Sequence, residues 1–262
     1  MRLPEPPWLA AHRGALPLLE NTIPALALAV EERADLLEFD VQPTLDGHLV
    51  LLHDLDLGRL AGRPDLVIQA ASLAELRDLE LRDPGEPVRA GRIATLADLL
   101  GALPPAFPVN IELKIGLADR QRLAGLALAA TAGRESVLFS SFDAGLLREL
   151  RRQSGAAHLA PIAGRWTPAL ELLGDELGAW SLHVASGIGA RARAGAGGVR
   201  GGPPLLVYTV NDARRARALL SAGAAGLFTD RPGPLRAELG MLGDSGVLSR
   251  TYRGTRAPRQ SA

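Results

Sequence analysis

Short apolar runs alternate with segments of helical period along most of this chain. The runs that we interpret as strands are Trp8–Ala11, Leu36–Val41, Leu49–His53, Val109–Ile115, Val137–Ser140, Leu159–Ile162, Trp180–Val184, Leu205–Val210 and Gly226–Thr229. Helical stretches between them include Thr22–Arg33, Leu96–Ala102, Asp119–Ala130, Ala144–Arg152, Asp212–Ala222 and Pro234–Leu239. A strand followed by a helix, repeated about eight times, requires parallel strands joined by crossovers, so the sequence predicts a single (β/α)8 barrel of the α/β class. The alternative is an open doubly wound sheet, but no glycine-rich nucleotide fingerprint follows the first strand.

The length of 262 residues, 47% of them hydrophobic, suits one such barrel with a large core. We assign residues 1–240 to the barrel domain and predict a flexible C-terminal extension over 241–262. Leu55–Gly91 is rich in Pro, Gly and charged residues, which predicts a short excursion after the second strand. Ser186–Pro204 is so rich in Gly, Ala and Arg that the pattern argues against a helix there.

Composition excludes several classes of function. Basic and acidic residues are equal at 29 each, so no overall charge favours nucleic acid or an anionic membrane as a partner. The chain has no cysteine, which excludes disulfides, thiolate metal sites and a cysteine nucleophile. The stretch MRLPEPPWLAAHRG has no apolar signal core, and no later run reaches the roughly 20 residues of a membrane span. We therefore expect a cytoplasmic protein without stable membrane insertion.

Polar side chains collect where neighbouring predicted strands end, and the segments that carry them are His12-Arg13, Glu38-Phe39-Asp40, His53-Asp54 and Glu112-Leu113-Lys114. Successive side chains of a strand point to opposite faces, so Glu38 and Asp40 share one face. Two carboxylates on one face repel each other and are costly to bury unpaired, so they need water, basic partners or a cation. Because a barrel binds its ligands at the C-terminal ends of the strands, this end is the predicted site.

Lys114 is the only lysine in the chain, so the other 28 of the 29 basic residues (29 − 1) are arginines. A compact ammonium differs from a planar guanidinium in size and in hydrogen-bond geometry. The position therefore requires a point charge, or else the lysine is there by chance.

A set of short motifs occurs in the order typical of the glycerophosphodiester phosphodiesterase family. The motifs are His12-Arg13-Gly14, Glu20-Asn21-Thr22, Glu38-Phe39-Asp40, Asp46-Gly47 followed by His53-Asp54, Ile111-Glu112-Leu113-Lys114, Ser141-Phe142, Tyr208-Thr209-Val210-Asn211 and Thr229-Asp230-Arg231-Pro232. The chain resembles that family from about Ala11 to Pro232. A single motif such as HRG is weak, but the ordered set is specific. The resemblance implies a TIM barrel enzyme, a phosphoric diester hydrolase that converts glycerophosphodiesters to glycerol 3-phosphate and an alcohol with the help of a metal.

The resemblance also implies a role for each matching side chain. The implied roles are Glu38, Asp40 and Glu112 as ligands of one divalent cation, His12 and His53 as the acid–base pair, Arg13 and Lys114 as phosphate-binding groups, and Tyr208 and Asn211 at the border of the substrate pocket. Oxygen ligands of this kind suit Mg²⁺ or Ca²⁺, and histidines exchange protons near neutral pH. The family mechanism uses the 2-hydroxyl of the substrate as nucleophile and passes through a cyclic phosphate that water opens.

Each of these roles has a structural alternative. Glu38 and Asp40 could pair with arginines, and His12 could be a buried histidine bonded to a backbone carbonyl. Glu20 could be a neighbour of the metal or could act in the capping of the helix that begins near Thr22. Strand packing would also explain Tyr208.

The substrate is less well defined than the catalytic residues. After His53-Asp54 the family usually has an Arg-Thr-Thr-like sequence, whereas this chain has Arg59-Leu60-Ala61-Gly62. Two other functions stay open: a lysophospholipase D-type reaction, for which Leu66-Val67-Ile68 is a candidate apolar rim, and a non-catalytic phosphate-binding barrel. A zinc enzyme with histidine ligands is disfavoured, because the acidic set offers only oxygen. The sequence does not decide which histidine acts first.

Overall fold

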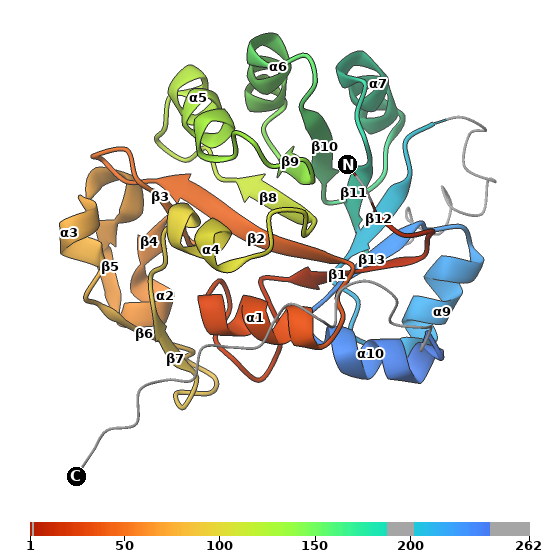
Figure 1. The fold of residues 1–262 in the computed structure, drawn as a ribbon, viewed down its shortest axis with the longest axis horizontal. Helices are drawn as coiled ribbons and strands as arrows, with labels where there is room; N and C mark the ends of the chain where they lie inside the picture. Colours follow the sequence, from red (N-terminus) through yellow and green to blue (C-terminus); the bar gives the residue numbers. More distant parts are fainter. Residues whose placement is uncertain (2, 188–201, 242–262) are drawn as a thin grey trace.

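A computed structural model of the chain describes residues 1, 3–187 and 202–241. Within these residues, eight parallel strands form a barrel (Figure 1). Each strand pairs with the strand on either side of it, and the pairing of β1 with β2 closes the barrel. The strands are β1 (Trp8–His12), β2 (Leu36–Pro43), β8 (Val109–Leu113), β9 (Val137–Ser141), β10 (His158–Ala163), β11 (Leu182–Ala185), β12 (Leu205–Tyr208) and β13 (Gly226–Thr229). A further strand, β3 (Leu49–Leu51), runs antiparallel to β2. The predicted barrel is confirmed, and the predicted strands are present with ends that shift by a few residues.

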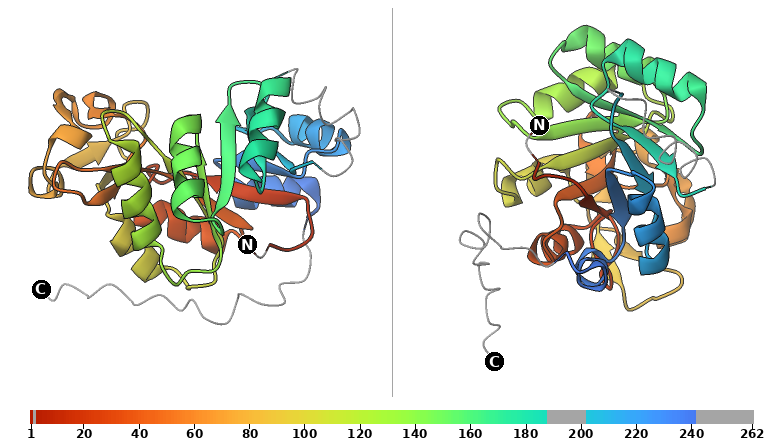
Figure 2. Two further views of the ribbon diagram at one scale, coloured as in Figure 1. Left: turned by 90° about the horizontal axis from the view of Figure 1, so that it is seen from above. Right: turned by 90° about the vertical axis from the view of Figure 1, so that its right-hand side faces the viewer.

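Helices cover the outside of the barrel, as the two views of Figure 2 show. They are α1 (Ile23–Glu31), α4 (Leu96–Ala102), α5 (Arg120–Ala130), α6 (Ala144–Gln153), α7 (Pro168–Leu177), α9 (Ala213–Ser221) and α10 (Pro232–Leu239). Several begin at a Thr or Asp whose side chain accepts a hydrogen bond from a backbone N–H of the first turn, for example Thr22 in α1 and Asp143 in α6.

Helix α7 is not among the helical stretches named from the sequence. Gly174 lies inside this helix, where glycine lowers helical propensity. A Cβ at this position would lie 2.7 Å from the Cδ2 atom of Leu182 on β11. The glycine therefore permits close packing of α7 on the barrel, which is a tertiary reason that no local pattern reveals.

Strand β2 separates a core face from a polar face. Leu37, Phe39 and Val41 are fully buried in the apolar cluster that also contains side chains of α1 and α5. Glu38 and Asp40, the residues between them, therefore point into the barrel. Parallel pairing with β8 sets Asp40 beside Glu112 in the register, and this brings the acidic residues of two strands to one level.

The excursion after β3 forms a small folded unit rather than an irregular loop, at one side of the barrel in Figure 1. It contains β4 (Asp56–Leu57), α2 (Gly58–Ala61), β5 (Arg63–Val67), the 3-10 turn η1 (Ile68–Ala70), α3 (Leu73–Leu76), β6 (Glu80–Arg82) and β7 (Ala90–Arg92). Its core includes Leu57, Leu60 and Ile68. The suggestion that Leu66-Val67-Ile68 forms an exposed rim is wrong, because Ile68 is fully buried and Leu66 packs against that core.

Two predictions fall largely outside the described residues. They are the absence of a helix in Ser186–Pro204 and the flexible extension over 241–262. Among the helices of the described part, none is long and apolar enough to cross a membrane.

Candidate active site

A cavity of about 250 Å³ opens at the carboxyl ends of the barrel strands. It is lined by His12, Arg13, Glu38, His53, Asn110, Glu112, Lys114, Phe142, Ile162, His183, Tyr208, Thr209 and Phe228. The lining combines charged side chains with the apolar side chains of Phe142, Ile162 and Phe228. Most of the predicted site residues therefore meet at one cavity. Asp40 is fully buried against Arg13 and Lys114, and Asn211 lies outside the lining.

Three carboxylates form the acidic part of the site. One oxygen from each of Glu38, Asp40 and Glu112 lies within 4.8 Å of the others. Ligands bound to one ion at 2.0–2.6 Å can be separated by at most about 4–5 Å, so this spacing fits a single divalent cation. Among the described residues, this is the one group of three or more acidic, histidine or cysteine side chains close enough to hold an ion.

The electrostatics of the three carboxylates also fit a cation. Burial and the charge of Asp40 raise the pKa of both Glu38 and Glu112 above the usual value. Burial opposes ionisation of Asp40 as well, but Arg13 and Lys114 lower its pKa below the usual value. The Nζ atom of Lys114 lies 2.8 Å from Oδ1 of Asp40 and also contacts Glu112. Two basic side chains thus offset part of the charge of three acids, and a bound cation would offset the rest.

Asn21 orients Asp40, a contact that the sequence analysis did not predict. Its Nδ2 atom donates to Oδ2 of Asp40 at 2.9 Å, and its Oδ1 atom accepts from the backbone N–H of Asp40 at 3.0 Å. Asn21 adopts a left-handed backbone conformation with φ of +55°, which asparagine tolerates better than most residues. Asn21 belongs to the Glu20-Asn21-Thr22 motif, but the motif alone does not identify Asp40 as the partner of Asn21.

Each catalytic candidate histidine is bound to an aspartate through Nδ1. The distance is 2.8 Å from His12 to Oδ1 of Asp230, and 2.8 Å from His53 to Oδ1 of Asp54. Burial opposes ionisation of both aspartates, but hydrogen bonds from the histidines and other neighbours lower their pKa values. Since an ionised carboxylate can only accept, Nδ1 of each ring carries a proton, and Nε2 is the nitrogen that can exchange a proton with another group. The alternative in which a backbone carbonyl binds His12 is wrong, because its partner is Asp230.

The same contacts affect the charge of His12. Burial lowers the pKa of His12, but the hydrogen bond with Asp230 and the charge of Glu38 outweigh it, so the pKa lies above the usual value. Asp230 was included in the Thr229-Asp230-Arg231-Pro232 motif without a role. Its position directly after β13, at the same end of the barrel as the other polar residues, is the signal that could have identified it.

Arg13 and Lys114 both line the cavity but contact carboxylates in this structure. Arg13 has a left-handed conformation with φ of +58°, and its backbone N–H donates to Oε2 of Glu38 at 3.0 Å. Its Nη1 atom donates to Glu20 at 3.2 Å, and its Nε atom lies 3.0 Å from Asp40. Binding of phosphate by these two side chains stays a prediction. Glu20 lies outside the three-carboxylate group and does not cap α1, since Thr22 is the N-cap.

Tyr208 and Asn211 occupy different positions relative to the cavity. The ring of Tyr208 lines it and packs edge-on against Phe142, while the Tyr208 hydroxyl donates to the carbonyl oxygen of Ala163 at 2.9 Å. Asn211 donates to Oδ2 of Asp230 at 2.5 Å and accepts from the backbone N–H of Asp230 at 2.9 Å. Asn211 therefore holds the aspartate that binds His12, and its contact with substrate stays a prediction.

His183 lies in the inner lining of the cavity and is 1% exposed. Its Nε2 atom lies 2.9 Å from Oγ of Ser181, and its ring packs edge-on against Phe228. Burial lowers its pKa from 6.5 to about 3, so His183 is neutral at pH 7. These contacts indicate a structural role for His183.

We predict that His183 makes stability depend on pH. Between pH 6.5 and about 3 the unfolded chain binds a proton that the folded chain excludes, so the free energy of unfolding falls as the pH falls. At about 1.4 kcal/mol per pKa unit, the full effect of this group is at most about 4–5 kcal/mol. Denaturant unfolding at several pH values should show a shallower decrease for His183→Gln than for the wild type. His48→Gln, at an exposed turn, is the control that should follow the wild-type slope, and parallel curves for all three proteins would contradict the prediction.

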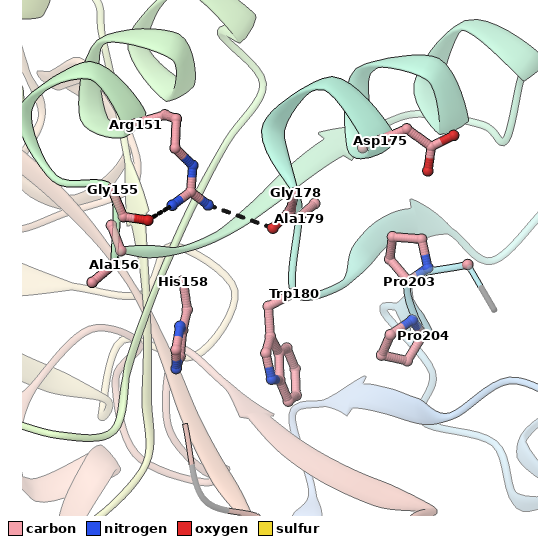
Figure 3. Close-up of a pocket in the computed structure, with 13 residues that line it drawn as sticks. Arg151, Gly155, Ala156, His158, Asp175, Gly178, Ala179, Trp180, Pro203 and Pro204 are labelled. Atoms are coloured by element: carbon pink, nitrogen blue, oxygen red, sulfur yellow. Dashed lines mark hydrogen bonds between the residues drawn. The ribbon is translucent and has the colours of Figure 1, made fainter.

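A second cavity, of about 650 Å³, lies at the opposite end of the barrel (Figure 3). Its lining residues, such as Gly155, Trp180 and Pro204, precede strands β10, β11 and β12. Arg151 projects beside it and donates to the carbonyl oxygens of Gly155 and Gly178, the latter at 3.4 Å. This cavity is larger than the first, but the three carboxylates and the two aspartate-bound histidines all lie at the other end.

Comparison with known proteins identifies the family to which this chain belongs. The model of the glycerophosphoryl diester phosphodiesterase family matches residues 11–234. A glycerophosphodiester phosphodiesterase of Caldanaerobacter subterraneus subsp. tengcongensis is 30% identical over 233 residues, which cover 85% of this chain and 93% of that protein. A lysophospholipase D of Mus musculus is 53% identical over 55 residues, which cover 21% of this chain and 17% of that protein.

The fold is similar to that of an Oleispira antarctica phosphodiesterase whose structure was solved in complex with the product sn-glycerol-3-phosphate. The TM-score is 0.80 with 24% identity, and the match covers 91% of this chain and 97% of the other. Since the family model spans residues 11–234 and so includes every residue of the described cavity, this chain belongs to the glycerophosphoryl diester phosphodiesterase family.

Proposed function

We propose that this chain hydrolyses glycerophosphodiesters to glycerol 3-phosphate and an alcohol in a metal-dependent reaction. The observation that carries the proposal is one cavity shared by a three-carboxylate group and two histidines, each held by an aspartate. Membership of the phosphodiesterase family supports it. A binding protein without catalysis would not need two histidines whose Nε2 atoms are left for the substrate, so the non-catalytic alternative is disfavoured.

Glu38, Asp40 and Glu112 would hold one divalent cation, and their oxygen ligands suit Mg²⁺ or Ca²⁺. Bound there, the cation would supply positive charge that polarises the phosphoryl group of the substrate. Asn21 keeps Asp40 in one orientation for this purpose.

Arg13 and Lys114 would stabilise the negative charge that develops on the phosphate oxygens. Arg13 already faces Asp40 through Nε and donates to Glu20 through Nη1, so we assign its Nη2 atom to the phosphate. Lys114 lines the cavity and contacts Asp40 and Glu112, so we assign its ammonium to the same phosphate. Donors fixed in advance in this way need little rearrangement as the charge forms.

The two histidines would move the protons. One histidine takes the proton of the substrate 2-hydroxyl through Nε2 while that oxygen forms its bond to phosphorus. The other gives a proton to the alcohol oxygen as its bond to phosphorus breaks, and this leaves a cyclic phosphate. Water then opens the cyclic phosphate with the two proton transfers reversed, which returns both histidines to their starting states.

The test is a substrate panel on the purified chain with Mg²⁺ or Ca²⁺. Glycerophosphocholine, glycerophosphoethanolamine, glycerophosphoinositol and lysophospholipids are supplied separately, and both products are measured. We expect equimolar glycerol 3-phosphate and free alcohol from at least one glycerophosphodiester. If no member of the panel is cleaved with either metal, the proposed function is wrong.

A lysophospholipase D-type reaction is the second candidate, and exposed apolar side chains near the cavity favour it. Leu117 and Phe142, which are 74% and 58% exposed, follow β8 and β9 at the end of the barrel that holds the site. Leu55, which is 45% exposed, lies beside Gly116 in the segment after β8. Such side chains suit the acyl chain of a lysolipid better than a small polar head group. Under this reading, Leu117→Ser should lower kcat/KM for lysophosphatidylcholine while leaving that for glycerophosphocholine unchanged. Equal effects on both substrates would remove this candidate.

A further inference from the structure

Arg59 joins two carboxylates that act on different parts of the site. Its Nε atom donates to Oδ2 of Asp54 at 2.6 Å, and Oδ1 of the same carboxylate holds Nδ1 of His53 at 2.8 Å. Its Nη2 and Nη1 atoms donate to Oε1 and Oε2 of Glu20 at 2.6 and 3.3 Å. Oε1 of Glu20 in turn accepts from Nη1 of Arg13 at 3.2 Å. Arg59 thus connects the carboxylate behind one catalytic histidine with the carboxylate behind the phosphate-binding arginine.

These contacts argue against a direct role of Arg59 in substrate binding. All three nitrogens of the guanidinium already donate to carboxylates, and Arg59 does not line the cavity. The Nε edge faces Asp54 and the paired Nη1 and Nη2 atoms face Glu20. A planar fork that donates in two directions fixes the angle between its partners, which an ammonium cannot do.

The excursion supplies the rigid support for this contact. Arg59 lies in α2, between Leu57 and Leu60, which are 0% and 3% exposed in the core of the excursion. Leu19, the residue before Glu20, is buried in the same core. The backbone on both sides of the Arg59–Glu20 pair is therefore anchored to one apolar cluster, although the two residues are 39 positions apart.

We propose that Arg59 is a positioning residue for the reaction, through which the excursion sets the orientation of His53 and Arg13 together. The inference rests on the proposed function. Without Arg59, the carboxylates of Asp54 and Glu20 would lose a common partner and could rotate. The imidazole of His53 would then be held less strictly in the form that leaves Nε2 for proton transfer.

Arg59→Met removes the bridge and keeps much of the aliphatic length. We expect kcat on the best glycerophosphodiester of the panel to fall about 10–100-fold, the usual effect of a group that orients a reacting residue, with a much smaller change in KM. Arg59→Lys should recover little of this loss, because its single ammonium restores the charge but not the two-sided geometry. Wild-type kcat in Arg59→Lys, or in Arg59→Met, would overturn the proposal.

Two controls separate positioning from a general loss of structure. Arg63→Met removes an arginine of the same excursion whose partner is the exposed Asp65, and it should keep wild-type kcat. Thermal unfolding identifies any variant that fails to fold. In an Asp54→Asn background, Arg59→Met should lower kcat by a much smaller factor than in the wild type, because the contact between residues 54 and 59 is already weakened. Full additivity of the two substitutions would contradict the proposal.

A spectroscopic measurement tests the inference without turnover. In metal-free protein at alkaline pH, ring ¹⁵N chemical shifts should show His53 with its proton on Nδ1, and the His53→Gln spectrum identifies its signals. Arg59→Met should shift the population toward the form with the proton on Nε2, whereas unchanged shifts would reject the positioning role. If the wild type cleaves no substrate but the shifts change as expected, the proposed function fails, and the part of the inference that survives is that Arg59 orients the ring of His53.

Discussion

Alanine in place of His12 or His53 should lower turnover of the best glycerophosphodiester by roughly 10²–10⁴-fold, the usual contribution of a positioned proton-transfer group. Each ring lines the cavity and is held at Nδ1 by an aspartate, so Nε2 is the atom that each substitution removes from the reaction. Steady-state kcat is the measurement, and thermal unfolding should show that the barrel remains folded.

The double variant tests whether the two histidines act in one process. Its loss should be smaller than the product of the two single losses, because groups that act as a unit have strongly non-additive effects. If both single variants retain near-normal turnover, the acid–base roles are wrong. The cation with Arg13 and Lys114 would then have to carry the chemistry.

An activated diester decides which histidine is the acid. A bis-p-nitrophenyl phosphate releases a leaving group that needs no protonation, so the variant that lacks the general acid should recover much of its rate. The variant that lacks the base should not recover. This substrate has no 2-hydroxyl and is attacked directly by water, so the result assigns the acid for that reaction.

The barrel could be predicted from sequence because its signal is local and repeated. Apolar runs of strand length alternate with helices along the chain, and the period of two in Leu37, Glu38, Phe39 and Asp40 already separates core residues from site residues. The convergence of the site residues also follows from topology, because the carboxyl ends of parallel strands share one end of a barrel. The roles of those residues came from the family resemblance and not from the pattern.

Some partners of these residues could not be predicted because they are distant in sequence, whereas His53 and its partner Asp54 are neighbours. His12 and Asp230 are 218 positions apart, and a single aspartate after a strand has many possible partners. The excursion was predicted, but its internal fold was not, because its proline, glycine and charged residues hide the few leucines that form its core. Its role beside His53 becomes visible only when Arg59 is seen between Asp54 and Glu20.

Removal of the metal from the three carboxylates should also have a large effect on turnover. Exhaustive chelation should abolish turnover, and added Mg²⁺ or Ca²⁺ should restore it, because Glu38, Asp40 and Glu112 together form an oxygen site for one hard cation. Glu38→Gln keeps the shape of the side chain but removes its charge. Calorimetric titration should show metal affinity reduced by at least about 10²-fold, beyond the 10–100-fold typical of residues that only surround the ligands. Glu20→Gln, a nearby carboxylate outside the group, is the matched control and should bind metal as the wild type does.

The same substitution should not destabilise the metal-free protein. Glu38 is 3% exposed and lies beside two other acids that Arg13 and Lys114 neutralise only in part, so its charge is unfavourable when no cation is bound. In chelator, Glu38→Gln should therefore be at least as stable as the wild type, with a free energy of unfolding higher by up to about 1 kcal/mol. Thermal unfolding is the measurement. Added metal should then stabilise the wild type and leave the variant almost unchanged. If the variant is less stable than the wild type in chelator and still binds metal with unchanged affinity, Glu38 is a structural residue and not a ligand.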